Sequence, residues 1–249
     1  MSDDWDVYFT HVDDKPASMF LDLGLAQEAP IPGLSVMAYI TLDFQDPDEN
    51  GMSKRSEYEK LLQIEDVLVA AVTHETSIFV GRCTTGGQRD FFFYMDNARG
   101  VEERVEAVMA SFEEYDWDIG LVEEPDWDTY FEYLYPDDQG MDTIWNNRVH
   151  RNLDAEGDDL SATREIDHWI QFPTEADLLA FKTEVEREGF TVTAQEKAAD
   201  KPYFEALVQR ADVPEDIDDV TWPLRELAGA HGGGYDGWGC VVVKKDGNS

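Results

Sequence analysis

The chain has 249 residues, of which 42% are apolar, enough to fold as one large domain or two of ordinary size. Its 55 acidic residues outnumber its 19 Lys and Arg and give a formal net charge of −36, which repels phosphate backbones and argues against direct nucleic-acid binding. The acidic N-terminus does not resemble a signal peptide and no apolar stretch reaches bilayer length, so we expect a cytoplasmic protein and no membrane contact.

Hydrophobic spacing divides the first half into a hairpin and a series of strands and helices. Val7 and Phe9, then Met19 to Leu21, flank a polar turn at 13–16, which predicts a β-hairpin. After the hairpin we expect a strand at 34–44, a helix at 53–72 capped by Ser53, strands at 77–84 and 89–95, a helix at 101–112, a strand at 117–122 and an aromatic segment at 127–135.

The negative charge is concentrated toward the end of this half. Residues 113–142 hold twelve acids and no Lys or Arg. Such a surface attracts a basic protein and accelerates the encounter. Glu123, Glu124, Asp126 and Asp128 are therefore candidate partner contacts, although solubility or adaptation to a salty cytoplasm accounts for the charge equally well.

The second half repeats the same order of elements. We expect a strand at 166–172, a helix that starts with Thr174 as its cap, strands at 190–195 and 203–210, a helix from about 214 and a strand at 238–243. Two βαββαβ units predict an α+β protein made of two tandem ferredoxin-like sandwiches with antiparallel sheets, the first with an extra N-terminal hairpin. The expected domains are 1–136 and 163–249, joined by an acidic connector at 137–162 that contains a short helix.

The glycine-rich run 231–240 is the most constrained segment of the second half. A phosphate loop is disfavoured, because here a helix precedes a strand instead of following one. Gly232 or Gly233 is expected to end the helix in a left-handed conformation, and the residues from Tyr235 to Trp238 are expected to form a tight turn with positive φ at Gly237. Trp238 is then either core or, with Tyr235 and Asp236, part of an exposed partner-binding anchor.

Two metal or nucleophile sites need to be considered. Asp46, Asp48, Asn50 and Glu57 have the spacing of a calcium loop, but an acidic turn before a Ser-capped helix explains the same residues. His168, His231, Asp236 and Cys240 could converge on a zinc ion or supply a Cys–His pair, but no ligand spacing supports this. We therefore expect no cofactor and no catalytic site.

Several motifs carry resemblances to known families. The second half, through the segments 166–169, 189–192 and 235–239, resembles the regulator of ribonuclease E activity B family. The motif residues that we take as structural are Asp167, His168, Trp169, Gly233, Gly237 and Gly239. The first half resembles an uncharacterised bacterial domain often found beside such modules, through the segments 5–9, 14–18, 80–85, 89–94 and 133–136.

The resemblance implies a ferredoxin-like, non-enzymatic regulator that binds ribonuclease E and restrains RNA decay. The acidic charge is compatible with ribonuclease E or another basic protein as the partner. The alternatives are a small-ligand or metal-binding module, with its site in a cleft between the sheets, and a salt-adapted protein with a different partner. The oligomeric state does not follow from the sequence.

Overall fold

The computed structural model describes residues 2, 4–196 and 202–245. By their internal contacts the residues form two compact units, 1–140 and 141–249. Both units combine helices with an antiparallel β-sheet, so the expected α+β class is confirmed. No helix in the described residues has the length and apolar character needed to cross a membrane.

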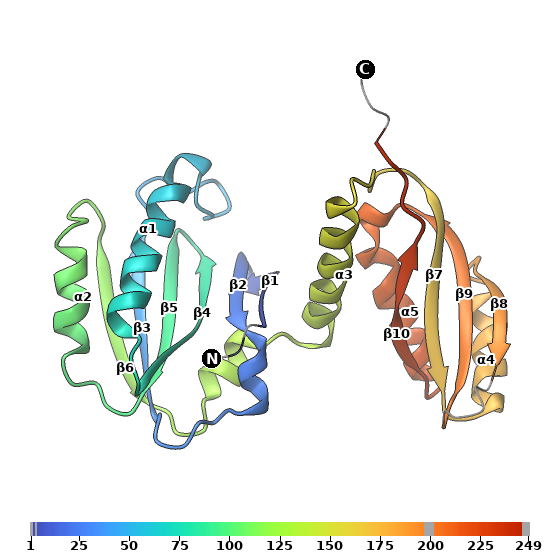
Figure 1. Cartoon of the computed structure of the whole chain (residues 1–249), viewed down its shortest axis with the longest axis horizontal. Coiled ribbons are helices and arrows are strands. Elements are labelled where there is room, and N and C mark those ends of the chain that lie inside the picture. The colour runs from blue at the N-terminus through green and yellow to red at the C-terminus, as the bar shows by residue number, and fades with distance from the viewer. Residues whose placement is uncertain (1, 3, 197–201, 246–249) are drawn as a thin grey trace. The chain divides into compact units, whose positions relative to one another are not determined.

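The first unit is built on a six-stranded sheet in the order β1-β2-β4-β5-β3-β6 (Figure 1). Its elements are β1 (Trp5–Val12), β2 (Lys15–Asp22), the 3₁₀ turn η1 (Leu23–Gln27), β3 (Val36–Asp43), α1 (Arg55–Val72), β4 (Ser77–Thr85), β5 (Gln88–Met95), α2 (Val101–Met109), β6 (Trp117–Glu123) and the π-helical turn η2 (Thr129–Leu134). Each predicted strand and helix of this half is therefore present, with ends that differ by a few residues.

The predicted hairpin is present and forms part of the main sheet. Asp13 and Asp14 form its turn with φ of 50° and 62°, the left-handed conformation that a type I′ hairpin turn requires at both positions. Lys15 and Pro16, expected in the turn, instead begin β2. Because β2 also pairs with β4, the hairpin extends the sheet by two strands.

Both faces of the first sheet are covered at the central strand β5. Phe91, Phe93 and Met95 of β5 pack under α1 and α2, in the core that also contains Leu61 and Val105. On the opposite face, Tyr94 stacks on Trp127 with ring centroids 3.9 Å apart, and both rings are buried. Burial on both faces explains why β5 is an unbroken apolar run and does not alternate with polar residues.

The start of α1 differs from the prediction. The helix begins at Arg55, and its N-cap is Lys54, which makes no side-chain capping bond. Ser53, the expected cap, instead forms an isolated β-bridge with Pro47. The loop before α1 is folded back on itself, and this geometry places Ser53 outside the helix.

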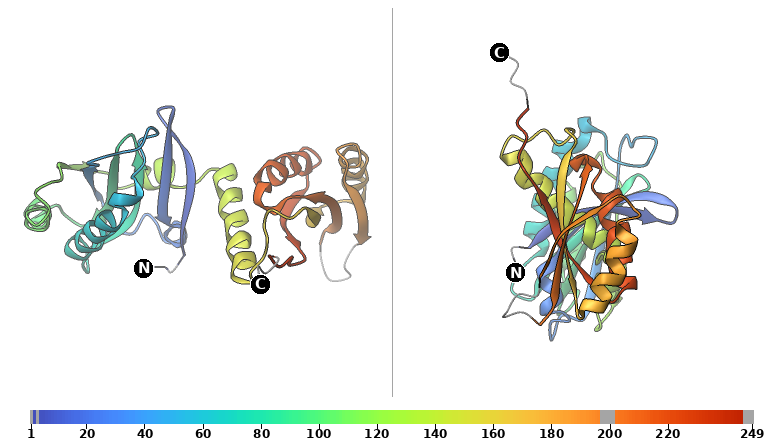
Figure 2. Two further views of the ribbon diagram at one scale, coloured as in Figure 1. Left: turned by 90° about the horizontal axis from the view of Figure 1, so that it is seen from above. Right: turned by 90° about the vertical axis from the view of Figure 1, so that its right-hand side faces the viewer.

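The second unit has a four-stranded sheet in the order β10-β7-β9-β8, in which every neighbouring pair is antiparallel. Its elements are α3 (Asp138–Ala155), β7 (Arg164–Phe172), α4 (Glu175–Val185), β8 (Thr191–Glu196), β9 (Phe204–Asp212), the 3₁₀ turn η3 (Pro214–Asp216), α5 (Asp218–Ala230) and β10 (Gly234–Cys240). Helices α4 and α5 lie on the same face of this sheet (Figure 2, left).

The burial pattern of β7 shows that the described residues cover one face of this sheet. Ile166, His168 and Ile170 are buried under the helices, while Asp167 and Trp169 between them are partly exposed. This strict alternation matches a strand with one face in the core and one toward solvent.

Helix α3 occupies most of the segment 137–162 that we expected to be a connector. It spans 18 residues, and Leu153 is buried in the same core as β7 and α5. Val149 packs against that core as well. From residue 141 onward the helix therefore belongs to the compact second unit.

The glycine run ends α5 as predicted but then departs from the prediction. Gly232 has φ of +70° and donates its N–H to the Gly229 carbonyl, while the Gly233 N–H donates to the Ala228 carbonyl, which together make a Schellman motif. β10 starts at Gly234, four residues before the expected position, and ends before Val241. Main-chain pairing with β7, which local spacing does not reveal, sets these limits.

Two glycines of this region should respond oppositely to the same substitution. Gly229→Ala should raise stability by about 0.5–1 kcal/mol, because Gly229 is helical and a Cβ there meets nothing within 4 Å. Gly232→Ala should lower stability by about 1 kcal/mol, because its φ is left-handed. Urea unfolding of both variants measures the pair, and equal shifts would contradict the assigned conformations.

Candidate functional site

A groove of about 600 Å³ lies in the second unit between α3, α5 and β10. Helix α3 contributes Asp142, Trp145 and Arg148 to its wall, and β10 contributes Tyr235, Asp236 and Trp238. The three predicted contacts of the glycine-rich motif thus come together with helix residues that sequence reasoning did not select.

Trp238 lines the groove and takes part in the hydrogen bonds that connect its walls. Its side chain is buried, and its indole Nε1 donates to Asn146 Oδ1 at 2.8 Å. Asn146 in turn donates through Nδ2 to Thr221 Oγ1 at 2.7 Å and to Asp218 Oδ1 at 2.6 Å. This buried chain of bonds joins α3 to β10 and α5, so the walls of the groove hold each other in place.

Tyr235 is the second buried aromatic residue of the motif. Its hydroxyl lies 2.8 Å from His168 Nδ1, at hydrogen-bonding distance, in the interior of the unit. Burial raises the pKa of Tyr235 above its ordinary value, and the charge of Asp142 adds to the rise. Burial also lowers the pKa of His168 from 6.5 to about 4, so the imidazole is neutral at physiological pH.

One end of the groove contains an ion pair in which the carboxylate is buried and the guanidinium is partly exposed. Arg225 donates through Nε to Asp142 Oδ1 at 2.8 Å, and its guanidinium lies 5.4 Å from the centre of the Tyr235 ring. Asp142 itself is only 4% exposed, and its second oxygen, Oδ2, has no hydrogen-bond partner within the described residues. This oxygen is buried, so its missing hydrogen bond is a local cost to the fold and is not open to the groove.

The rim of the groove is aromatic and charged. Trp145 is 50% exposed, and the guanidinium of Arg148 lies 4.6 Å from the centre of its ring. Asp236 of β10 is also exposed. Exposed Trp and Arg are the residue types that most often dominate the binding energy of protein interfaces.

The segment from Tyr235 to Trp238 is not the tight turn that we predicted. It lies within β10, where the register with β7 shifts between Tyr235 and Gly237, and Gly237 has φ of +135°. The predicted positive φ is therefore correct, but it produces a β-bulge. The bulge lets Tyr235 and Trp238, which are three residues apart, both point into the core.

The other motif residues have structural positions. A Cβ on Gly233 would lie 2.4 Å from the ring of Phe172, so no larger residue fits there. Gly239 pairs with Asp167 across the strands and faces the ring of Trp169. Asp167 accepts a bond from Gln209 Nε2 at 2.6 Å on the open face of the sheet.

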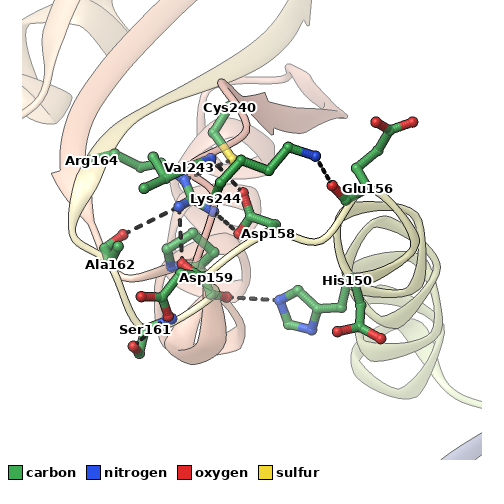
Figure 3. A network of polar contacts seen from close by, with 12 residues as sticks. His150, Glu156, Asp158, Asp159, Ser161, Ala162, Arg164, Cys240, Val243 and Lys244 are labelled. Atoms are coloured by element: carbon green, nitrogen blue, oxygen red, sulfur yellow. Dashed lines mark hydrogen bonds and ion pairs between the residues drawn. The ribbon is translucent and has the colours of Figure 1, made fainter. Parts of the chain in front are cut away.

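A buried polar network fixes the far end of α3 (Figure 3). Arg164 donates to Asp158 Oδ1 at 2.5 Å and to the Asp159 carbonyl at 3.1 Å, while its Nε lies 3.2 Å from Cys240 Sγ. Asp158 is fully buried, and its other oxygen accepts from the Val243 N–H at 2.7 Å. The network ties the loop after α3 to the start of β7 and to the residues that follow β10.

The four acidic candidates of the first unit differ from one another. Glu124 accepts from the Thr129 N–H at 3.0 Å and from the Tyr94 hydroxyl, so it organises the start of η2. Glu123 is exposed and accepts a bond from Ser35 Oγ at 3.3 Å. Asp126 and Asp128 are exposed. Three of the four remain suited to partner contact.

The three carboxylates of the calcium-like pattern are occupied locally. Asp48 Oδ1 accepts from the Asn50 and Met52 N–H groups at 2.8 Å, and Asp46 pairs with Lys54 at 2.6 Å. Glu57 Oε1 accepts from the Gln45 N–H at 2.9 Å. These bonds fit the acidic-turn explanation of the pattern.

The residues considered for zinc or a nucleophile pair have separate neighbours. His168 meets Tyr235, Cys240 meets Arg164, and His231 Nε2 lies 3.3 Å from Glu184. Within residues 2, 4–196 and 202–245, no group of three or more His, Cys, Asp or Glu side chains is arranged to hold a metal ion.

His168 should make stability depend on pH. The unfolded histidine binds a proton near pH 6.5, whereas the buried one stays neutral to about pH 4, so stability falls as the pH drops through this window. Between pH 7 and 5 the loss should be about 2 kcal/mol. Urea unfolding of the wild type and of His168→Gln isolates this contribution, since the carboxylates contribute equally to both. A wild type and variant with the same pH dependence would refute it.

Comparisons with known proteins divide the chain at α3. Residues 3–135 match the model described as a family of unknown function (DUF695), and residues 143–240 match the model described as regulator of ribonuclease activity B. The second match begins inside α3 and includes every groove residue named above except Asp142. No curated protein matches the chain.

Two solved structures cover most of the chain at low similarity. A putative glycine cleavage system transcriptional repressor is 8% identical, with 84% of this chain and 98% of that chain covered and a TM-score of 0.27. An unknown protein from Galdieria sulphuraria is 10% identical, with 81% and 96% covered and a TM-score of 0.22. Neither likeness is close enough to support an argument about fold or function. Because the first family model covers more than half of the residues, the chain belongs to the DUF695 family of unknown function, and this region is followed by a segment that matches a family of regulators of ribonuclease activity.

Proposed function

We propose that the chain is a non-catalytic regulator that binds a ribonuclease, ribonuclease E or its assembly, and modulates RNA turnover in the cytoplasm. The match of residues 143–240 to regulators of ribonuclease activity carries this proposal. The groove lies almost entirely inside the matched segment, which makes it the natural docking surface of the second unit.

We further propose that both units are ferredoxin-like sandwiches. The strand orders β6-β3-β5-β4 and β10-β7-β9-β8 support this, because each unit then follows a βαββαβ chain order with antiparallel neighbours. On this view the first domain ends near residue 136, and α3, within the expected connector 137–162, works with the second domain.

The groove has the composition of a protein-binding site. Its floor is rigid, because Trp238 and Asn146 are buried and bonded to each other. Its rim presents Trp145, a large side chain that loses little entropy on binding. A rigid floor under an exposed aromatic anchor favours binding of a partner side chain or short segment.

The charge of the chain supports a basic protein partner. The net charge of −36 disfavours RNA itself as the ligand and favours a positively charged region of a ribonuclease. Glu123, Asp126 and Asp128, exposed in the first unit, add to the attraction. The charge would act mainly on the rate of encounter, while the groove would supply the lasting contacts.

A second candidate function is binding of a small cationic ligand in the same groove. The volume of about 600 Å³ suits a small molecule, and the exposed carboxylate of Asp236 in the groove wall offers an acceptor. A small ligand would stabilise the folded chain in proportion to its concentration, whereas the proposed regulator needs no such ligand.

Trp145→Ala should weaken binding to purified ribonuclease E at least 10-fold, about 1.4 kcal/mol, because it removes the exposed anchor of the groove. The matched control is Leu179→Ala, which removes a 49% exposed side chain from α4, outside the groove. Isothermal titration of both variants tests the proposal. Equal affinities for Trp145→Ala and the wild type would remove the groove from the interaction.

Replacing Glu123, Asp126 and Asp128 together by the corresponding amides should slow association with ribonuclease E several-fold at low salt. The association rate should then depend less on salt, and the dissociation rate should change little. Glu124 is left intact because it bonds to Thr129. The control replaces three exposed acids of α2, Glu102, Glu103 and Glu106, by Gln and so makes the same change in net charge. Stopped-flow rates that fall equally in both variants would show a general charge effect without a local contact.

A further inference from the structure

The strand β6 leaves one edge of the first sheet open. It is the last strand in the order β1-β2-β4-β5-β3-β6, and within the described residues it pairs only with β3. An open edge carries N–H and C=O groups that another extended chain can pair with.

The pairing with β3 identifies which groups point outward. The Asp43 N–H donates to the Asp116 carbonyl at 3.0 Å, and the Glu124 N–H donates to the Ser35 carbonyl at 2.7 Å. Antiparallel strands alternate, so even-numbered residues between these bonds face β3 and odd-numbered residues direct their main-chain groups away from it. The outward residues are Trp117, Ile119, Leu121 and Glu123.

One outward group is already occupied, and this confirms the assignment. The Ile119 N–H donates to the side chain of its neighbour Asp118 at 2.8 Å, which it can do only on the side away from β3. The outward groups of Leu121 and Glu123 lie further along the edge. They form the stretch at which an incoming strand would find main-chain partners.

The side chains beside this stretch are apolar. Leu121 is 47% exposed and Val122 is 42% exposed, and being adjacent they lie on opposite faces of the sheet. Between Val122 and Asp118, the ring of Tyr39 lies over Gly120, where a Cβ would be only 2.1 Å from it. The edge is thus flanked by apolar contacts on both faces.

The charges on β6 discourage pairing with a second copy of this strand but not with a basic strand. Edge strands are commonly guarded by Lys, Pro or a bulge, and residues 117–123 contain no Lys or Pro and pair with β3 in continuous register. The charges present are negative, Asp118 and Glu123, and residues 113–142 contain no Lys or Arg. Like charges repel a second copy of this strand, whereas a strand with Lys or Arg is attracted.

We propose that the outer edge of β6 receives an extended, basic segment of a protein partner, which adds to the sheet as a further strand. The segment bonds to the outward main-chain groups of Leu121 and Glu123. It places its Lys or Arg side chains on the face of Asp118, and its apolar side chains on the opposite face beside Leu121. This mode of binding rests on the proposed function for the partner's identity, and it gives the first unit a role in holding that partner.

The proposal is tested with a substitution that blocks only the outer edge. Leu121→Pro removes an N–H that points away from β3, so it leaves the β3–β6 bonds in place while its ring obstructs pairing. Leu121→Ala is the matched control, since it shortens the side chain and retains the N–H. Circular dichroism and thermal melting establish that both variants are folded.

The probe is a fluorescent ten-residue peptide of alternating Lys and Val, measured by anisotropy with the full chain. We expect Leu121→Pro to weaken binding at least 10-fold and Leu121→Ala to weaken it less than about 3-fold. The same peptide with N-methyl groups on alternate residues should not bind. Equal binding by Leu121→Pro and wild type, or by the two peptides, overturns strand addition.

A second measurement does not depend on the Pro variant folding. Amide hydrogen exchange of the wild-type chain should slow at Leu121 and Glu123 when the peptide is added, and not at Val122, whose N–H already faces β3. Unchanged exchange at Leu121 and Glu123 in a peptide-saturated sample overturns the proposal.

Purified ribonuclease E separates this inference from the proposed function. Binding of the ribonuclease that is equal for wild type and Leu121→Pro keeps the function and overturns the inference. Peptide binding that depends on Leu121 without ribonuclease binding keeps the edge site and removes the function. Sedimentation that shows a wild-type dimer, lost in Leu121→Pro, overturns the basic segment as the occupant.

Discussion

The second unit depends on how α3 is held against β10. The indole N–H of Trp238 is buried and reaches Asn146, so removing α3 from this position would leave a buried donor without a partner, at a cost of about 1–3 kcal/mol. Arg225 and Asp142 fix the same helix near its start, and the network around Arg164 fixes the loop after its end. Because the helix is anchored along its length, the groove between it and β10 is a preformed surface.

Several of the Arg side chains form ion pairs with carboxylates within their own unit. Arg164 and Arg225 point inward to Asp158 and Asp142, and in the first unit Arg82 and Arg89 both pair with Glu65. Buried charges need such partners, because an unpaired one is strongly destabilising. These four cations are paired with three carboxylates, so they do not balance the remaining acids of the chain.

Sequence patterns were sufficient to predict the strands and helices but not the groove. The strands from β3 to β6 and the helices between them follow local periodicity and were predicted within a few residues. The bulge at Gly237 and the early start of β10 depend on pairing with the distant strand β7, which a local pattern does not contain. The polar sequence of α3 likewise concealed that Asn146 and Leu153 are buried, because a single polar acceptor meets Trp238 only in three dimensions.

The position of α3 also limits where the chain can be divided. The helix starts at Asp138, beside the last residues of the first family match, but its apolar residues belong to the second unit. A fragment cut at residue 163 would keep all four strands of the second sheet and lose the acceptor of Trp238 and one wall of the groove. In evolutionary terms, the two modules can be exchanged as intact pieces only at a junction ahead of this helix.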